Sequence, residues 1–383
     1  MSDWVTAKLK EVAKVVTGKT PQTSKSEYYG GNIPFVSPAD LNEGILSETK
    51  TYLTSSGADQ VYRVPKNTVL VSCIGNLGKL AITSKEVCFN QQINGLIFDE
   101  QKIFPKYGFY CAQTLKPQLE KASSSTTLPI VNKSRFSDLE IQYPPLAEQR
   151  RIASILDKAD ELRQKRQQAI EKLDQLLQAT FIDMFGDPVL NNKKFPTKTL
   201  GELGGWSSGG TPSRTEPSYF KGEIPWYTSG ELNAVYIEDS IERISELALD
   251  KSSAKLIPIG SLLVGMYDTA AFKSSITTVP SACNQAIAFG QLNSNLVNTL
   301  YIYYCIQLSK DSLKKMQRGV RQKNLNLSMI KSISIPFPDI KLQNKFSEIS
   351  TKLMIQRGTL EQSSDNLDSL FKSLQDQAFS GNL

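Results

Sequence analysis

The residues with the most obvious potential for chemistry lie at 13–20, where Ala-Lys-Val-Val-Thr-Gly-Lys-Thr satisfies a relaxed phosphate-loop pattern. A nucleotide loop needs several glycines, so that backbone N–H groups can wrap around phosphates, and a helix that follows. Here the interior, 14–16, is bulky and β-prone, and the matching segment at 208–212, Ser-Gly-Gly-Thr-Pro, has no lysine. We therefore do not expect ATP binding, and we interpret the shared Gly-x-Thr-Pro as a turn that leaves Lys19 free to contact a phosphate.

Two other segments have a superficial catalytic pattern. Asp40 with 48–50 (Glu-Thr-Lys) resembles the carboxylate and lysine set of metal-dependent nucleases, but the spacing is short, and the second half has Glu231 with 242–243 (Glu-Arg) instead. The Tyr-Pro-Pro-Leu at 143–146 resembles the Asn-Pro-Pro-Tyr loop of amino-methyltransferases but lacks its asparagine, and no glycine-rich cofactor loop accompanies it. We interpret the first as a solvated face and the prolines as the start of a helix.

Histidine is absent from the chain, which excludes Ser-His-Asp hydrolases, Cys-His proteases, histidine-dependent nucleases and imidazole metal sites. The five cysteines are odd in number and never form Cys-x-x-Cys, which argues against a disulfide framework and a zinc site. We expect buried cysteines, no metal and no cofactor.

Polar loops are a better candidate for function than any catalytic set. The loops 75–79 and 268–273 each follow an expected strand and carry a lysine, so they could approach a phosphate closely. Asn90 with Gln91–Gln92, and Asn284-Gln285, have amide side chains of the kind that read adenine in the major groove. The alternatives are ordinary turns and buried amides that fix the backbone. The halves differ most at 123–127 (Ser-Ser-Ser-Thr-Thr) against 317–321 (Gln-Arg-Gly-Val-Arg), which is a candidate for base reading or phosphate clamping.

The elements that must position these loops occur twice. Residues 17–21 match 208–212 and 33–35 match 224–226 at an offset of 191, and the offset grows to 193 at 69–71 and to 194 at Asn90, Tyr110 and Asn132. Such a small drift is what loop insertions produce between two copies of one fold. In each copy, strands are expected at 68–72 and 139–143, and at 261–264 and 333–337, with helices at 107–121 and 301–317 between them. The globular regions are therefore predicted to be α+β.

Each copy ends in a long helix with apolar residues at alternating three- and four-residue steps, which predicts a two-helix antiparallel coiled coil related by an internal pseudo-twofold repeat. The alternative is two unrelated surface helices that pack on their own domains. A helix of about 38 residues is roughly 57 Å long, so the coil would separate the domains by a fixed distance. The predicted seam is Ile152, Ile155, Ala159, Leu162, Arg166, Ala169, Leu173, Leu176 and Thr180, and, 194 residues later, Phe346, Ile349, Leu353, Gln356, Leu360, Ser363, Leu367, Leu370 and Leu374.

The net charge of +6 is unevenly distributed. The globular segments 1–145 and 188–339 carry excesses of three and four positive charges, whereas the helical segments 146–187 and 340–383 sum to −1. A basic excess in repeated domains makes a polyanionic partner plausible. The N-terminus lacks the organisation of a secretion signal and no apolar run approaches a membrane span, so we expect a cytoplasmic protein with no membrane contact.

Together with the layout, several motifs resemble the specificity subunit of type I restriction-modification systems. They are Thr-Gly-Lys-Thr-Pro at 17–21, Ile-Pro-Phe-Val at 33–36, Ser-Cys-Ile-Gly-Asn-Leu-Gly-Lys at 72–79, Asn90-Gln91 and, most specifically, Pro-Pro-Leu-Ala-Glu-Gln-Arg-Arg-Ile at 144–152. The resemblance covers nearly the whole chain. The second copy has Pro-Asp-Ile-Lys-Leu-Gln-Asn at 338–344 instead, so its docking surface is expected to be weaker or differently built.

The resemblance implies a non-catalytic subunit in which target recognition domains 1–145 and 188–339 each read half of a split double-stranded DNA site. The segments 146–187 and 340–383 are then spacer helices on which two methyltransferase subunits dock, joined by restriction subunits. The residues predicted for subunit docking and for the coil are Glu148, Gln149, Arg150, Ile152, Ile155, Leu162, Leu173, Leu176, Phe346, Ile349, Leu353, Leu360, Leu367 and Leu370. The predicted DNA contacts are Lys19, Thr20, Asn76, Lys79, Gln91, Gln92, Lys133 and Arg135, and then Thr211, Arg214, Lys273, Gln285, Arg318, Arg321 and Lys323. The alternative functions are a scaffold with tandem protein- or glycan-binding domains, and an enzyme in its own right.

Overall fold

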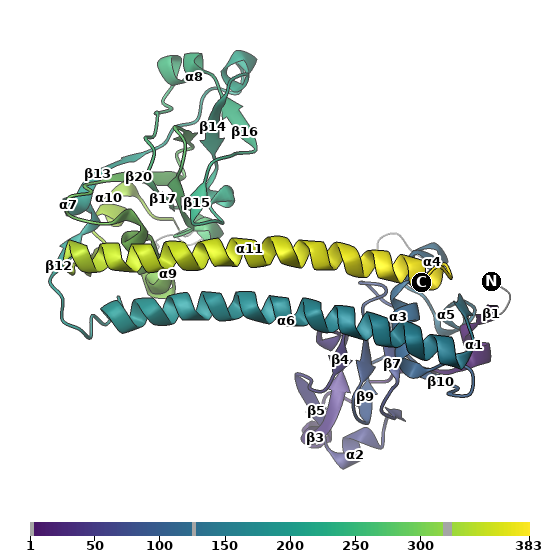
Figure 1. Cartoon of the computed structure of the whole chain (residues 1–383). Coiled ribbons are helices and arrows are strands. Elements are labelled where there is room, and N and C mark those ends of the chain that lie inside the picture. The colour runs from purple at the N-terminus through teal and green to yellow at the C-terminus, as the bar shows by residue number, and fades with distance from the viewer. Residues whose placement is uncertain (1–3, 125–127, 317–323) are drawn as a thin grey trace. The chain divides into compact units, whose positions relative to one another are not determined.

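The structure is a computed structural model that describes residues 4–124, 128–316 and 324–383. The chain forms two compact units, of which unit 1 comprises residues 1–167 and 362–383, and unit 2 comprises residues 168–361. Each unit contains one globular α+β domain and parts of two long helices, α6 (Leu146–Phe185) and α11 (Ile340–Phe379) (Figure 1).

The domain of unit 1 is built on two larger sheets and one strand pair. The five-stranded sheet has the order β2 (Ala13–Thr17), β10 (Ile93–Phe98), β7 (Val69–Ser72), β8 (Leu80–Thr83) and β4 (Ile45–Leu46). The four-stranded sheet has the order β5 (Thr51–Leu53), β3 (Tyr29–Val36), β9 (Val87–Phe89) and β6 (Arg63–Val64), and β1 (Val5–Lys8) pairs with β11 (Glu140–Tyr143). The short helices are α1 (Leu9–Val12), α2 (Ser55–Ala58), α3 (Pro105–Gln113), α4 (Lys116–Ala122) and α5 (Lys133–Ser137).

The domain of unit 2 repeats this topology, except that its second sheet has no described strand corresponding to β6. Its five-stranded sheet has the order β13 (Gly204–Ser208), β20 (Ile287–Leu292), β17 (Leu262–Gly265), β18 (Ser274–Thr277) and β15 (Tyr236–Ile237). A second sheet consists of β16 (Glu242–Ile244), β14 (Ile224–Tyr227) and β19 (Ala282–Cys283), and β12 (Thr197–Thr199) pairs with β21 (Ser334–Pro336). The helices are α7 (Leu200–Leu203), α8 (Glu246–Lys251), α9 (Thr299–Leu313) and α10 (Leu327–Lys331). The predicted duplication is confirmed, because corresponding strands occupy the same places in both sheets.

The predicted strands are present, but one predicted helix is interrupted. The segment 107–121 forms α3 and α4, which are separated at Thr114 and Leu115. Pro117 explains the break, because proline has no N–H for a helical hydrogen bond to residue 113 and disfavours helical geometry in the residue before it. In the second copy no proline occurs at the corresponding position, and α9 continues to Leu313.

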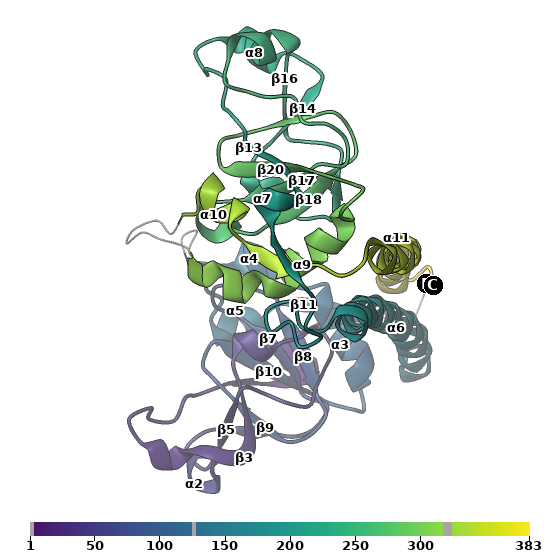
Figure 2. The same cartoon turned by 90° about the vertical axis from the view of Figure 1, so that its left-hand side faces the viewer.

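Each domain shares its hydrophobic core with the long helices. In unit 1, Ile152, Leu156 and Phe371 belong to one cluster with the buried side of the five-stranded sheet. In unit 2, Phe181 and Phe346 are in the corresponding cluster. The second sheet of each unit lies at the end of the domain away from the long helices (Figures 1 and 2). The helices are therefore integral parts of the domains and not flexible tethers.

The two long helices pair antiparallel, as predicted. In unit 1, Arg163 of α6 contacts Asp368 near the end of α11, and in unit 2, Phe185 near the end of α6 packs on Phe346 near the start of α11. The predicted seam, however, is wrong by one residue at every second position. Leu162, Leu176 and Leu370 are about half exposed, and Ile155 and Ile349 are only partly buried. The inner positions are instead Leu156, Arg163, Ile170 and Leu177, and Ser350, Arg357, Ser364 and Phe371.

The error has a physical reason. Leucine occurs on both sides of the true seam, so an apolar pattern does not distinguish Leu176 from Leu177. The inner layer also contains Arg163 and Arg357, which a search for apolar residues passes over.

Candidate nucleic-acid interface

In both domains the Gly-x-Thr-Pro turn lies against the Asn-Gln loop. In unit 1, Gly18 N donates to Ile93 O at 3.1 Å, Lys19 N donates to Phe89 O at 2.9 Å, and Thr20 Oγ1 donates to Gln91 Oε1 at 2.5 Å. In unit 2, Thr211 Oγ1 donates to Gln285 Oε1 in the corresponding hydrogen bond. The structure thus brings together two pairs of predicted DNA contacts, Thr20 with Gln91 and Thr211 with Gln285.

Close backbone approach explains the first glycine of this turn. A Cβ atom on Gly18 would lie 2.2 Å from Asn90 O, and one on Gly209 would lie 2.2 Å from Cys283 O. No side chain fits at either position, so the glycine is needed for the turn to reach the Asn-Gln loop.

The asparagine and the glutamine of the Asn-Gln pair have different roles. Asn90 Oδ1 accepts from Gln92 N at 3.1 Å and Asn284 Oδ1 accepts from Ala286 N at 3.0 Å, so both asparagines fix their own loops. Gln91 is exposed, while Gln92 is partly buried and accepts a hydrogen bond from Asn90 Nδ2. The alternative interpretation of a backbone-fixing amide therefore fits Asn90 and Asn284, and the exposed glutamine remains a candidate contact.

Backbone hydrogen bonds join further loops to this edge of unit 1. Cys73 N donates to Gln92 O at 2.8 Å, Val131 N donates to Cys73 O at 2.9 Å, and Gly75 N donates to Pro129 O at 2.9 Å. The loops 18–20, 73–79, 90–92 and 128–131 consequently form one continuous edge, on which Asn76 is exposed. We call these four loops the polar edge of unit 1.

The two lysines that directly precede β8 and β18, Lys79 and Lys273, differ in their backbone neighbours. Lys79 follows Gly78, whose φ is +80°, whereas Lys273 follows Phe272, which adopts a φ of +62° at the corresponding position. Lys273 Nζ donates to Asn233 Oδ1 at 2.7 Å and to Gly230 O at 3.2 Å, so it holds a neighbouring turn. Burial, followed by the nearby charges of Lys314 and Lys273, lowers the pKa of Lys310.

The remaining predicted contacts of unit 1 lie on α5. Asn132 Oδ1 accepts from Arg135 N at 2.9 Å and caps the helix, and Asn326 caps α10 in the same way. Arg135 Nη1 donates to Ala122 O at 3.0 Å and so connects α5 to the end of α4, whereas Lys133 is exposed.

Arg214 is held on the surface of unit 2. Its guanidinium forms two hydrogen bonds with the Glu242 carboxylate, which lower the pKa of that carboxyl, and it lies 4.4 Å from the ring centre of Phe220. Arg318, Arg321 and Lys323, together with 125–127 of the divergent loop, lie outside the described residues.

The structure buries three of the residues predicted for docking or for the coil, Gln149, Ile152 and Phe346. Gln149 is fully buried: its Oε1 accepts from Phe104 N at 2.8 Å and its Nε2 donates to Lys102 O and Pro144 O, both at 2.8 Å. Its amide is therefore fully occupied inside unit 1 and cannot meet a partner. Glu148 and Arg150 on the same turn of α6 are exposed or nearly so: Glu148 pairs with Arg151, and Arg150 lies over Phe104.

Sequence reasoning missed the counterpart, Gln343. It is also fully buried, accepts from Asn298 N at 2.9 Å and donates to Pro338 O at 2.9 Å. The signal is in the sequence, because Gln343 lies 194 residues after Gln149, the same offset that relates the predicted seams of the two helices.

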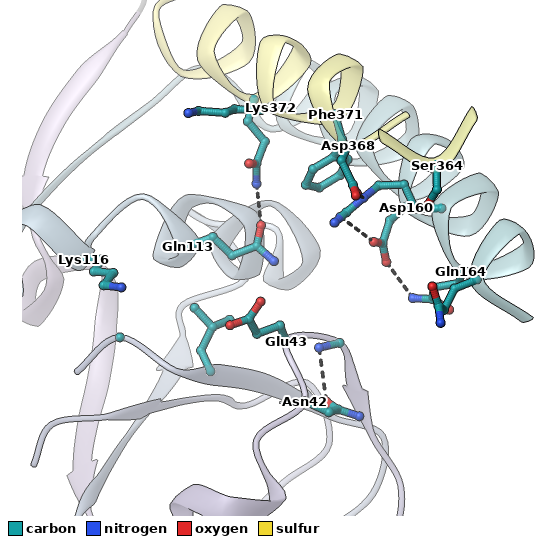
Figure 3. Close-up of a pocket in the computed structure, with 16 residues that line it drawn as sticks. Asn42, Glu43, Gln113, Lys116, Asp160, Gln164, Ser364, Asp368, Phe371 and Lys372 are labelled. Carbon is teal, nitrogen blue, oxygen red and sulfur yellow. Dashed lines mark hydrogen bonds and ion pairs between the residues drawn. The ribbon is translucent and has the colours of Figure 1, made fainter. Parts of the chain in front are cut away.

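A polar groove of about 650 Å³ lies in unit 1 where the domain meets the long helices (Figure 3). The loop of Asn42 and Glu43 forms one wall, and Asp160 and Asp368 belong to the other. Gln113 and Gln375 are joined by a hydrogen bond across it. Gly78 of the polar edge also lines this groove.

In the described part of the chain, no group of three or more Cys, Asp and Glu side chains is placed to hold a metal ion. None of the described helices combines the length and apolar character needed to cross a membrane.

The sequence model described as "Type I restriction modification DNA specificity domain" matches residues 1–172 and 192–366, which is most of the chain and both copies. The chain belongs to this family. The prediction of a type I specificity subunit, the DNA-recognition component of such a system, is thereby confirmed.

Named relatives support this identification. The MjaIX specificity subunit of Methanocaldococcus jannaschii is 26% identical over 374 residues, which cover 91% of this chain and 86% of the relative. The EcoR124I/EcoR124II specificity subunit of Escherichia coli is 28% identical over 275 residues, 66% of this chain and 64% of the relative. A solved specificity subunit from M. genitalium matches with a TM-score of 0.61 at 16% identity, over 98% of this chain and 96% of that one, and so shares the fold of this specificity subunit.

Proposed function

We propose that the two domains of this specificity subunit read two different halves of an asymmetric, interrupted site in double-stranded DNA. The observation that carries the proposal is the repetition of one topology with different polar residues on corresponding loops. Thr20 with Gln91 and Thr211 with Gln285 keep the turn, while the loop 75–79, Gly-Asn-Leu-Gly-Lys, differs from the corresponding loop 268–273, Asp-Thr-Ala-Ala-Phe-Lys. Two similar scaffolds with divergent edges are suited to two different base sequences.

The polar edge of unit 1 is proposed to face the DNA. Lys19 and Lys133 are exposed and supply positive charge for phosphates, while Gln91 and Asn76 are exposed and supply amides for base edges. In unit 2, Thr211, Arg214 and Gln285 have the corresponding role, and the cluster of Lys273, Lys310 and Lys314 adds positive charge.

The long helices are proposed to serve as spacer and docking surface. Two methyltransferase subunits would dock on α6 and α11, through Glu148, Arg150 and exposed leucines such as Leu162, and restriction subunits would join them. The specificity subunit itself would catalyse no step and would act in the cytoplasm. The domain boundaries proposed for these roles remain 1–145, 146–187, 188–339 and 340–383.

The decisive experiment is co-expression with a candidate adenine methyltransferase subunit, followed by genome-wide mapping of methylated bases. We expect one split motif with unlike halves about one helical turn, roughly 10 bp, apart. The appearance of no split motif would contradict the proposal, and so would methylation that did not require this chain.

A second measurement separates DNA reading from a scaffold that binds proteins or glycans. Duplex affinity should fall steeply with salt, because phosphate contacts release counterions, and Lys19→Gln with Lys133→Gln should reduce the slope of log K against log salt by about 2. Lys352→Gln, an exposed lysine on α11, is the matched control and should leave the slope unchanged. A salt-independent affinity would favour the scaffold.

A further inference from the structure

The inner layer of the paired helices contains one arginine from each helix. Arg163 of α6 and Arg357 of α11 are 194 residues apart, and their acidic partners, Asp368 and Asp174, are also 194 residues apart. The same reciprocal ion pair is thus built twice, once in each unit.

In unit 1, Arg163 Nε donates to Asp368 Oδ1 at 2.5 Å and its Nη1 lies 3.3 Å from Asp160 Oδ1. The guanidinium also lies 4.5 Å from the ring centre of Phe371, which is buried. In Figure 3, Asp160 of α6 and Asp368 of α11 lie beside the ring of Phe371. Arg163 is therefore held by both helices at once.

In unit 2, Arg357 Nε donates to Asp174 Oδ1 at 2.9 Å, and its Nη1 pairs with Glu361 Oε1 at 2.8 Å. Arg357, like Arg163, is therefore held by one carboxylate of the opposite helix and one of its own helix. Phe371 has no aromatic counterpart here, because the matching residue is Leu177, so the ion pair is the part that both units share.

These pairs are poorly suited to a role in stability alone. The arginine side chains are 34% and 39% exposed, and partly exposed ion pairs contribute about 0–1 kcal/mol each. An apolar residue at an inner position of a coil would bury more surface. A polar residue there is known to select one register at a cost in stability.

Registers that differ from the observed one by one heptad give the two arginines different partners. A slip of one heptad in one direction would place Arg163 opposite Glu361 but Arg357 opposite Gln167. A slip in the other direction would place Arg163 opposite Gln375 and Arg357 opposite Phe181. Among these three registers, only the observed one gives both arginines a carboxylate on the opposite helix.

We propose that the Arg163–Asp368 and Arg357–Asp174 pairs fix the register of α6 against α11 and thereby set the spacing at which the two half-sites are read. These four side chains are positioning residues, since they act through the helices and touch no base. The inference rests on the proposed function, because spacing has meaning only if both domains bind one duplex.

The test measures affinity for duplexes that contain both mapped half-sites at the natural spacing and at spacings about 3 bp longer and shorter. That step corresponds to one heptad, about 10.5 Å of helix, at 3.4 Å per base pair. In Arg163→Asp, with like charges at 163 and 368, the preference for the natural spacing should fall by about tenfold or more, a loss of about 1.4 kcal/mol. The exchange Arg163→Asp with Asp368→Arg should restore it, and the Arg357 and Asp174 exchange should do the same.

Lys165→Asp is the matched control. Lys165 is exposed and pairs with Glu161 of its own helix, so this variant should leave the spacing preference unchanged. Affinity for each isolated half-site should stay at the wild-type value in all variants, which a general loss of folding would not allow. If Arg163→Asp does not fold, the exchanged variant still tests the inference. Wild-type spacing preference in Arg163→Asp, or failure of both exchanges to restore it, would overturn the inference. A wild-type protein with no preference for a split site would instead overturn the proposed function.

Discussion

A single buried amide anchors the start of each long helix. Gln149 and Gln343 each bond a backbone N–H of the domain and the carbonyl of the proline before the helix, Pro144 or Pro338. Glutamine is suited to this position because one side chain supplies both an acceptor and a donor. A residue that the family motif suggested for docking is thus explained by the attachment of the helix to its own domain.

Replacing Gln149 with leucine should destabilise the protein by about 3 kcal/mol, because the N–H of Phe104 and two carbonyls lose their partner while buried. Urea denaturation measures the change. Gln178→Leu, an exposed position on the same helix, should change the free energy of unfolding by less than about 0.5 kcal/mol. Equal effects from the two variants would show that the amide bonds contribute little.

The five cysteines should not react in the folded protein. Burial raises the pKa of Cys73, Cys111, Cys283 and Cys305 to about 12 and that of Cys88 to about 11. Since the thiolate is the reactive form, labelling with a thiol reagent at pH 8 should be negligible until the protein unfolds, when all five thiols should react. Rapid labelling of the native protein would mean that at least one core opens locally.

At the turn of the polar edge, Gly18→Ala should weaken binding to the half-site of unit 1, since the added methyl group would overlap Asn90 O. The expected loss of stability is about 1–3 kcal/mol, as for other overpacked sites. Gly205→Ala is the control, because nothing lies within 4 Å of its Cβ position. Fluorescence anisotropy measures the affinity of each variant for the half-site of unit 1, and urea denaturation measures its stability. Both should fall in Gly18→Ala and stay near the wild-type values in Gly205→Ala.

At the scale of elements, helix periodicity and strand patterns predicted most of the fold. The long helices, their antiparallel pairing and the strands at 69–72 and 140–143 follow from the sequence because apolar spacing reflects burial directly. The seam register could not be predicted from apolar spacing, because Leu176 and Leu177 are equally apolar and because polar residues, Arg163, Ser350, Arg357 and Ser364, occupy half of the inner positions. The loops of the polar edge and their counterparts in unit 2 could be predicted from the sequence. The hydrogen bonds of Lys273 and Arg214 in unit 2 could not, because their partners are distant in sequence.

The corrected seam makes a direct prediction for adjacent leucines. Leu177 is 7% exposed and belongs to the core of unit 2, whereas Leu176 is 50% exposed. Leu177→Ala should cost about 2–5 kcal/mol in unfolding free energy, and Leu176→Ala less than about 1 kcal/mol. Urea denaturation measures the change. A larger loss of unfolding free energy for Leu176→Ala than for Leu177→Ala would support the seam predicted from the sequence.

At the scale of the whole molecule, the proposed function assigns the spacing of the half-sites to the length of the helices and the choice of bases to the loops. Inserting one heptad into α6 after Gln167 and one into α11 after Glu361 keeps the inner layer in phase. The mapped motif should then keep both half-sites while its spacer changes by about 3 bp, because seven residues add about 10.5 Å. Altered bases at an unchanged spacing would contradict the division of roles.

The two units also differ in the number of chain segments from which they are built. Unit 2 is one continuous segment, residues 168–361, whereas unit 1 needs residues 362–383 to complete a core begun at the other end of the chain. There, Phe371 and Ala378 pack among the residues of the first domain, and Arg151 Nη2 donates to Leu383 O at 2.6 Å. On the ribosome, which releases residues in order, unit 2 has all its parts before unit 1 does. The first domain to be translated is consequently the last to close its core, and until then its apolar surface is exposed to chaperones and proteases.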